Sequence, residues 1–237
     1  INTNSTLGSS NFDGTIQSTV KVNASAGFSI TGWTGTGSNA TIGHGMGVAP
    51  SVIIIKARDR SDNWWVYHKG LSDPSTKAIQ LNNINAEFTP STSAFNPSAF
   101  TSSVFGVLTD GSSNASGEKY IAYCFNEVSS YSKFGSYTGN GNADGPFVFT
   151  SFKIAFLLIR GTHSDLWYIY DNKRNTFNVV DKELNPNNSQ SEATFTTVDF
   201  LSNGFKIRTS NSSFNYNNYN YIYLAFAESP FKNARAR

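Results

Sequence analysis

Short apolar stretches separated by polar turn residues run along the whole chain. Two of them, Val52–Ile55 and Ile154–Ile159, are apolar at consecutive positions, which indicates central strands covered on both faces. No stretch shows the spacing of an amphipathic helix, apart from room for one helical turn near 182–193. The pattern predicts strands near 27–34, 39–43, 51–58, 63–69, 77–82, 103–109 and 118–127, and again near 133–138, 147–150, 154–161, 166–171, 177–181, 204–210 and 219–228.

The same pattern occurs twice, about 100 residues apart. An aromatic–Thr–Gly–x–Gly segment at Trp33–Gly37 returns at Tyr137–Gly141, an offset of 104 residues. Further matched blocks follow in the same order: 52–56 with 156–160, 64–67 with 167–170, 100–109 with 200–209, and 120–127 with 221–228. The offset changes by only four residues across the unit, from 104 to 100, which small loop insertions explain.

This organisation predicts an all-β protein with two tandem antiparallel β-sandwich repeats, jelly-roll-like, of about 100 residues each. We expect a linker plus a leading strand over residues 1–24, the first repeat over 25–130 and the second over 131–237. The long polar segment 82–100, with Pro90 and Pro97, is predicted to be a loop.

Composition narrows the possible functions. The chain is 14% aromatic but only 14% charged, and its net charge of +2 comes from scattered basic residues, so we expect no nucleic-acid partner. The single cysteine, Cys124, allows no intrachain disulfide, and no apolar run is long enough for membrane insertion as a helix. Because the first residue is Ile1, we expect the chain to be a C-terminal part of a longer protein.

No motif indicates catalysis. The Gly-rich stretch around His44 is followed by a predicted strand instead of the helix of a phosphate-binding loop, so it is interpreted as a turn. The histidines lack metal-ligand spacing, and nothing marks an Asp pair such as Asp59 and Asp62 as an acid–base pair. We therefore expect no catalytic residue, no cofactor and no metal.

Two segments are candidate ligand-binding sites. Adjacent Trp64 and Trp65 must point to opposite faces of a strand, and the match of Trp167 with Trp64 predicts that Trp65 is the exposed ring, with Tyr67 beside it. Packing of both tryptophans in the core is the alternative.

The second segment, 211–221, is dense in Asn and Tyr, whereas its counterpart 111–117 is a plain polar turn. Tyr and Asn combine rigid contact area with adaptable hydrogen bonding. The predicted contacts in this loop are Asn215, Tyr216, Asn217 and Tyr219; a wide exposed turn without a ligand is the alternative.

The chain resembles a repeat family of virion proteins from marine tailed bacteriophages over about residues 13–237. The segments that carry this resemblance are Gly27–Ile30, Thr41–Gly45 with Val48–Pro50, Trp65–Lys69, Tyr120–Phe125, Phe134–Gly141, Asp144–Val148, Asp199–Lys206 and Ala225–Arg235. The resemblance implies a tail-fibre-like protein at the virion surface and transfers no catalytic residue.

Three functions follow as hypotheses. The first is a non-enzymatic, adhesin-like module that binds a host-surface glycan or protein and gains avidity as a homo-oligomer, which we guess to be a trimer. The second is a structural virion protein, such as a capsid decoration or tail component, whose surfaces meet other virion proteins. The third is a glycan-cleaving enzyme, which needs a close carboxylate pair.

Overall fold

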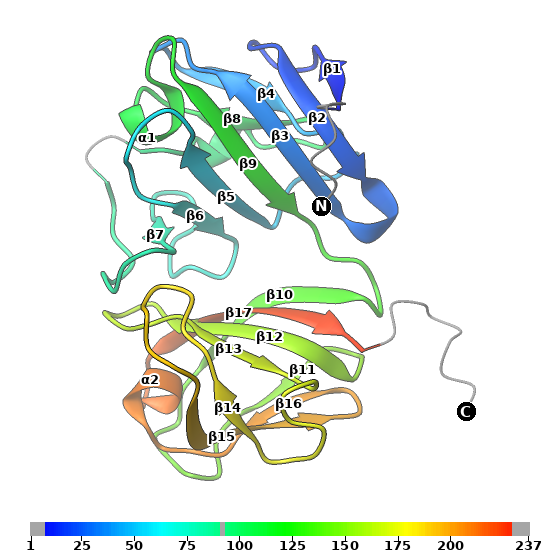
Figure 1. Ribbon diagram of the computed structural model, residues 1–237, viewed down its shortest axis with the longest axis vertical. Helices are drawn as coiled ribbons and strands as arrows, with labels where there is room; N and C mark the ends of the chain where they lie inside the picture. The colour runs from blue at the N-terminus through cyan, green and yellow to red at the C-terminus, as the bar shows by residue number, and fades with distance from the viewer. Residues whose placement is uncertain (1–7, 91–92, 229–237) are drawn as a thin grey trace. The chain divides into compact units, whose positions relative to one another are not determined.

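The computed structural model describes residues 8–90 and 93–228, and its chain forms two compact units (Figure 1). Within this range, the first unit contains the residues up to His68 together with Asp73–Gln80 and Phe88–Asn126. The second contains Lys69–Ser72, Leu81–Glu87 and the chain from Glu127 onward. Strands dominate both units and all paired strands are antiparallel, which confirms the predicted all-β class.

The first unit contains one large and one small sheet. The large sheet has the order β1-β2-β3-β9-β5-β6-β7, and β4 pairs with β8 in the small sheet. The strands are β1 (Ser9–Asn11), β2 (Ser18–Asn23), β3 (Phe28–Thr34), β4 (Ala40–Gly43), β5 (Val52–Ala57), β6 (Trp65–His68), β7 (Ile79–Gln80), β8 (Val104–Val107) and β9 (Lys119–Phe125).

The second unit contains two four-stranded sheets. Their orders are β10-β17-β12-β13 and β11-β16-β15-β14. The strands are β10 (Ser132–Thr138), β11 (Phe147–Phe149), β12 (Ile154–Gly161), β13 (Tyr168–Asp171), β14 (Val180–Glu183), β15 (Ala193–Leu201), β16 (Gly204–Ile207) and β17 (Asn220–Ala227).

Four neighbouring strands of the first unit's large sheet have the same order as the four strands of one sheet in the second unit. The order β3-β9-β5-β6 in the first unit corresponds to β10-β17-β12-β13 in the second. Ile55 of β5 lies opposite Ala122 of β9, and Ile159 of β12 lies opposite Tyr223 of β17. The blocks that match in sequence therefore occupy equivalent strands.

In each unit, side chains from both sheets share one core. In the first unit, Trp33 and Ile55 of the large sheet pack in one cluster with Ile42 and Phe105 of the small sheet. Cys124 is also fully buried in this cluster, and burial raises the pKa of its thiol to about 12. The corresponding cluster of the second unit joins side chains of β10, β12 and β17 to side chains of β11, β15 and β16.

Several elements differ from the sequence prediction. β1 lies in the segment that was expected to be a linker, while residues 1–7 of that linker lie outside the described range. β15 was not predicted, and the equivalent part of the first unit is a loop with the short 3₁₀ helix Pro97–Ala99. Two four-residue helices, α1 (Gly111–Asn114) and α2 (Ser212–Asn215), and the 3₁₀ helix Ala24–Ala26 complete the fold.

Candidate functional site

The predicted exposed tryptophan lies in the core instead. Trp65 is only 6% exposed and belongs to the core cluster of the first unit, where its ring centroid lies 5.4 Å from that of Phe88. The neighbouring Trp64 points to the other face of β6 and is half-buried. The prediction that Trp65 is the exposed ring is therefore wrong, and this ring is not accessible to a ligand.

The wrong prediction for Trp65 followed from the match of Trp64 with Trp167. Trp64 and Trp167 do occupy equivalent positions in the two units. Trp64 immediately precedes the residue paired with Ile55, and Trp167 immediately precedes the residue paired with Ile159. Trp167 is buried, however, outside the hydrophobic core cluster of its unit, with the Arg160 guanidinium 5.3 Å from its ring centroid. A buried residue in one unit was thus not evidence that its counterpart faces the core.

Tyr67 also packs inside the first unit. Its ring centroid lies 6.0 Å from that of Phe95 and 4.8 Å from that of Phe100, and desolvation raises the pKa of its hydroxyl. Trp65 and Tyr67 alternate with Trp64 and Val66 along β6, so both project toward the smaller sheet. The structure does not place these two rings on an open surface.

Asn215 is fully buried and supports the loop 211–221 from inside. Its Nδ2 donates to the carbonyl oxygen of Thr209 at 2.9 Å and of Asn142 at 2.6 Å, and its Oδ1 accepts from the Asn140 backbone N–H at 2.7 Å. Asn215 is thus a structural residue, and the prediction that it contacts a ligand directly is incompatible with its burial.

Tyr221 holds the other end of this loop. Its hydroxyl donates to the carbonyl oxygen of Ser212 at 2.5 Å and accepts from the backbone N–H of Tyr216 at 2.8 Å. Burial raises the pKa of the Tyr221 hydroxyl to about 12, which extends to higher pH the range in which the protonated hydroxyl can keep both bonds. Asn215 and Tyr221 together fix where the next side chains emerge.

The four consecutive residues Tyr216, Asn217, Asn218 and Tyr219 of this loop are all exposed and are here called the tyrosine tip. Tyr216 is 52% and Tyr219 42% exposed, and their rings meet edge to face at 90° with centroids 4.7 Å apart. Such a contact is favourable for aromatic rings and restricts both side chains. Of the predicted site residues, Tyr216, Asn217 and Tyr219 are therefore accessible and lie together.

Backbone geometry shapes the tip. Asn218 has a φ of 64°, in the left-handed region that Asn tolerates better than most residues, and its N–H donates to the carbonyl oxygen of Gly139 at 2.9 Å. The equivalent position in the first unit is Gly117, with a φ of 80°. Both turns thus use the same backbone shape, but only the second presents aromatic rings.

A histidine and a carboxylate lie beside the tip. The His163 ring packs edge-on against Tyr219 with centroids 5.0 Å apart, and His163 Nε2 is 3.4 Å from Asp165 Oδ2. The other oxygen, Oδ1, accepts from the Leu166 N–H at 2.7 Å and from the Tyr168 hydroxyl at 2.8 Å. These contacts hold a polar pair next to an exposed ring.

Sequence reasoning did not connect His163 and Asp165 with the tip. The connection comes from the register of β12 and β17, in which Gly161 lies opposite Tyr221. His163 follows Gly161 by two residues and Tyr219 precedes Tyr221 by two, so the pairing continues past the strand ends. Strand pairing is needed to find this contact, because no local motif signals it.

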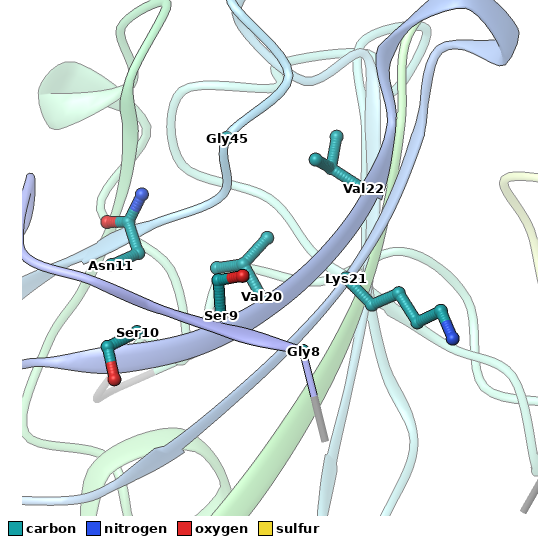
Figure 2. A pocket seen from close by; sticks show the side chains of 8 residues that line it. All are labelled: Gly8, Ser9, Ser10, Asn11, Val20, Lys21, Val22 and Gly45. Atoms are coloured by element: carbon teal, nitrogen blue, oxygen red, sulfur yellow. The ribbon is translucent and has the colours of Figure 1, made fainter. Parts of the chain in front are cut away.

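Two open hollows lie elsewhere. In the first unit, a hollow of about 500 Å³ lies beside β1 and β2, and Figure 2 shows that no aromatic ring is among the residues that line it. In the second unit, a hollow of about 380 Å³ is lined by polar side chains such as Asn172 and Asn175, and by Phe177, which is 85% exposed. Sequence analysis had singled out neither.

No group of three or more His, Cys, Asp or Glu side chains among the described residues could hold a metal ion. Among the helices of this part of the chain, none is long and apolar enough to cross a membrane.

Comparison with known families gives one match. Residues 3–230 match the model of a family described as "Domain of unknown function (DUF7483)". The chain belongs to this DUF7483 family. No curated protein and no solved structure matches the DUF7483 chain. The tyrosine tip and both hollows lie within the matched range.

Proposed function

We propose that this chain is a non-enzymatic adhesion module at the surface of a tailed-bacteriophage virion, where it binds a glycan of the host cell surface. The observation that carries the proposal is the exposed, edge-to-face pair of Tyr216 and Tyr219 on a rigidly held loop. The resemblance of the sequence to tail-fibre-like virion proteins supplies the biological setting.

The chemistry of the tip suits a sugar ring. Tyrosine faces stack on the C–H faces of sugars, and the tyrosine hydroxyls and the Asn217 amide can exchange hydrogen bonds with sugar hydroxyls. His163, held by Asp165, packs edge-on against Tyr219 and restricts the position of that ring. A preorganised loop loses little conformational freedom on binding, which favours even a small contact. Repeated copies on one particle raise the total strength by avidity.

An array of bacterial surface polysaccharides tests the proposal. The fluorescently labelled chain is applied to the array beside the double variant Tyr216→Ala/Tyr219→Ala. The matched control is Phe195→Ala, which removes a ring that is 60% exposed on β15. We expect the wild-type chain and the control to bind the same polysaccharides and the double variant to bind none. Equal binding by all three proteins would refute the tip as the binding site.

Gold-labelled antibodies against the chain test its place on the particle. Label at the tips of tail appendages supports adhesion. Label over the head or along the tail shaft supports the alternative, a structural virion protein that contacts other virion proteins. That alternative has one structural argument, the exposed Phe147 and Phe149 on β11.

A further inference from the structure

β11 of the second unit has a free edge. Among the described residues it pairs only with β16, with Val148 opposite Phe205. On either side of this pair, Ile207 N bonds to Pro146 O and Thr150 N bonds to Asn203 O. In an antiparallel ladder, hydrogen-bonded residue pairs alternate with pairs that are not hydrogen-bonded. Val148 therefore bonds to β16, whereas the backbone groups of the residues on either side of it face outward.

These outward groups belong to Phe147 and Phe149. In the part of the chain that the structure describes, no hydrogen bond reaches their outward N–H and C=O groups. Their side chains are 47% and 60% exposed. An uncharged strand edge with two exposed rings is a ready template for another strand, because proteins usually protect such edges with charge, a bulge or a covering segment.

The equivalent edge of the first unit is covered. There, Ile42 lies opposite Phe105 as Val148 lies opposite Phe205, so the outward groups belong to Thr41 and Gly43. The segment Thr15–Ser18 of the same unit bonds to both residues. Its bonds are Ile16 N to Thr41 O at 3.1 Å, Thr41 N to Thr15 Oγ1 at 2.9 Å, and Ser18 Oγ to Gly43 O at 2.9 Å.

The first unit thus covers this strand edge with a segment of its own chain, whereas the second unit leaves the equivalent edge open. We propose that β11 pairs antiparallel with β11 of a second copy of the chain, about a two-fold axis at Val148. In this register Phe147 lies opposite Phe149 of the second copy, and each of the two pairs exchanges two backbone hydrogen bonds.

The second copy is the occupant that the geometry favours. The outward residues on both sides of Val148 are identical, so a two-fold rotation brings each donor to an acceptor and each Phe ring beside another Phe ring. The segment Phe147–Phe149 carries no charge that would repel its own copy. Two-fold pairing makes a dimer, and this replaces the trimer expected from the sequence as our proposal.

The interface is short, so we expect a weak dimer. Three residues pair in each strand, which is far less contact than in a stable obligate dimer. Dimer formation should therefore rise with protein concentration and be measurable up to about 1 mM. On a particle that carries many copies, such a contact gains strength because the copies are held close together.

Sedimentation equilibrium of the full chain tests the dimer. Phe149→Pro removes an N–H that faces outward, so the ladder with β16 stays intact while the new pairing loses a donor. Phe149→Asp places one carboxylate opposite Phe147 of each copy, so two desolvated negative charges lie diagonally across the interface. The matched control is Phe177→Asp, which changes a ring that is 85% exposed but lies far from β11 along the chain. Circular dichroism confirms that each variant is folded.

We expect the wild type and Phe177→Asp to dimerise with the same dissociation constant, and both Phe149 variants to dimerise at least 10-fold more weakly. A wild-type chain that is monomeric up to about 1 mM overturns the proposal. So does a Phe149→Pro chain that dimerises like the wild type, since this would place the interface elsewhere.

Cysteine cross-linking tests the register. When Phe147→Cys and Phe149→Cys variants are mixed, the proposed pairing places the two new thiols directly opposite, within the Cα separation that a disulfide spans. Each variant alone places its thiols diagonally, beyond about 7 Å. We expect cross-linked dimers in the mixture and few in the separate samples. Equal cross-linking in all three samples would overturn the register. Cys124 does not interfere, because it is fully buried.

Discussion

Asn114 and Asn215 make three equivalent hydrogen bonds to the backbone in the two units. Each is fully buried, and each accepts a backbone N–H bond at its Oδ1, from Thr36 at 2.9 Å and from Asn140 at 2.7 Å. Each Nδ2 donates to two backbone carbonyls. The loop that looked like a plain turn in the first unit therefore has the same internal support as the tyrosine tip.

Replacing either asparagine should destabilise the protein. Asn114→Ala or Asn215→Ala leaves buried backbone groups without partners, at a cost of about 1–3 kcal/mol for each group that water cannot reach. Urea unfolding measures the change. Asn217→Ala is the control, because Asn217 is exposed and should change stability by less than about 0.5 kcal/mol. Equal shifts for Asn215→Ala and Asn217→Ala would contradict the supporting role.

Removing a core side chain from β5 should have a larger effect. Ile55 is fully buried between the sheets of the first unit, and Ile55→Ala should lower the free energy of unfolding by about 2–5 kcal/mol. Ile84→Ala, at a side chain that is 55% exposed, is the matched control. Thermal or urea unfolding compares the two. A small effect at Ile55 would contradict its place in the core of the first unit.

His44 should make stability depend on pH. Its Nδ1 accepts from the Met46 N–H at 3.2 Å, so the neutral ring donates from Nε2 to the Thr101 carbonyl oxygen, also at 3.2 Å. Protonation would place a second N–H against that of Met46. Burial lowers the pKa of His44 below the ordinary histidine value of 6.5 in the folded protein.

The direction of this pKa shift determines whether stability rises or falls with pH. A histidine whose pKa is lowered on folding stabilises the protein fully above pH 6.5, and the contribution is lost as the pH falls through the folded pKa. We expect the free energy of unfolding to decrease between pH 7 and pH 5.5, and the decrease to be smaller in His44→Gln. Urea unfolding at both pH values checks this. The same slope in both proteins would assign the pH dependence to other groups.

The two tip tyrosines should contribute separately to ligand binding. Once a polysaccharide is identified, Tyr216→Ala and Tyr219→Ala should each weaken its binding by about 10-fold or more, as loss of an aromatic contact commonly does. Isothermal titration calorimetry gives the dissociation constants. His163→Phe keeps a ring against Tyr219 but removes the polar atoms, so it separates packing from hydrogen bonding. A tip variant that binds like the wild type would exclude that ring from the site.

The strands could be predicted where the sequence pattern itself records burial. The apolar runs at Val52–Ile55 and Ile154–Ile159 became β5 and β12 because a strand covered on both faces needs apolar residues at consecutive positions. β15 was missed because the strands of the two halves were predicted by matching one half to the other. The first unit has a loop, not a strand, at the equivalent place.

The candidate site was predictable only in part. Tyr and Asn density located the tip, but composition does not distinguish Asn215, which bonds inward, from Asn217, which faces solvent. Alternation showed that Trp64 and Trp65 face opposite ways, yet the core-facing side depends on where the second sheet packs. His163 joined the tip through strand register, which is a long-range property that no local motif records.

The shared support of the two loops makes the protein a natural display scaffold. Between the buried asparagine and the buried tyrosine, the four residues 216–219 in one unit and 115–118 in the other can vary in side chain without disturbing the bonds that hold the loop. The left-handed position, Gly117 or Asn218, restricts the choice of residue, and proline is excluded at Ala115 and Tyr216, whose backbone N–H groups bond to the tyrosine hydroxyl. A lineage under pressure to recognise new surfaces could change specificity by rewriting one short peptide, with the rest of the fold left as it is.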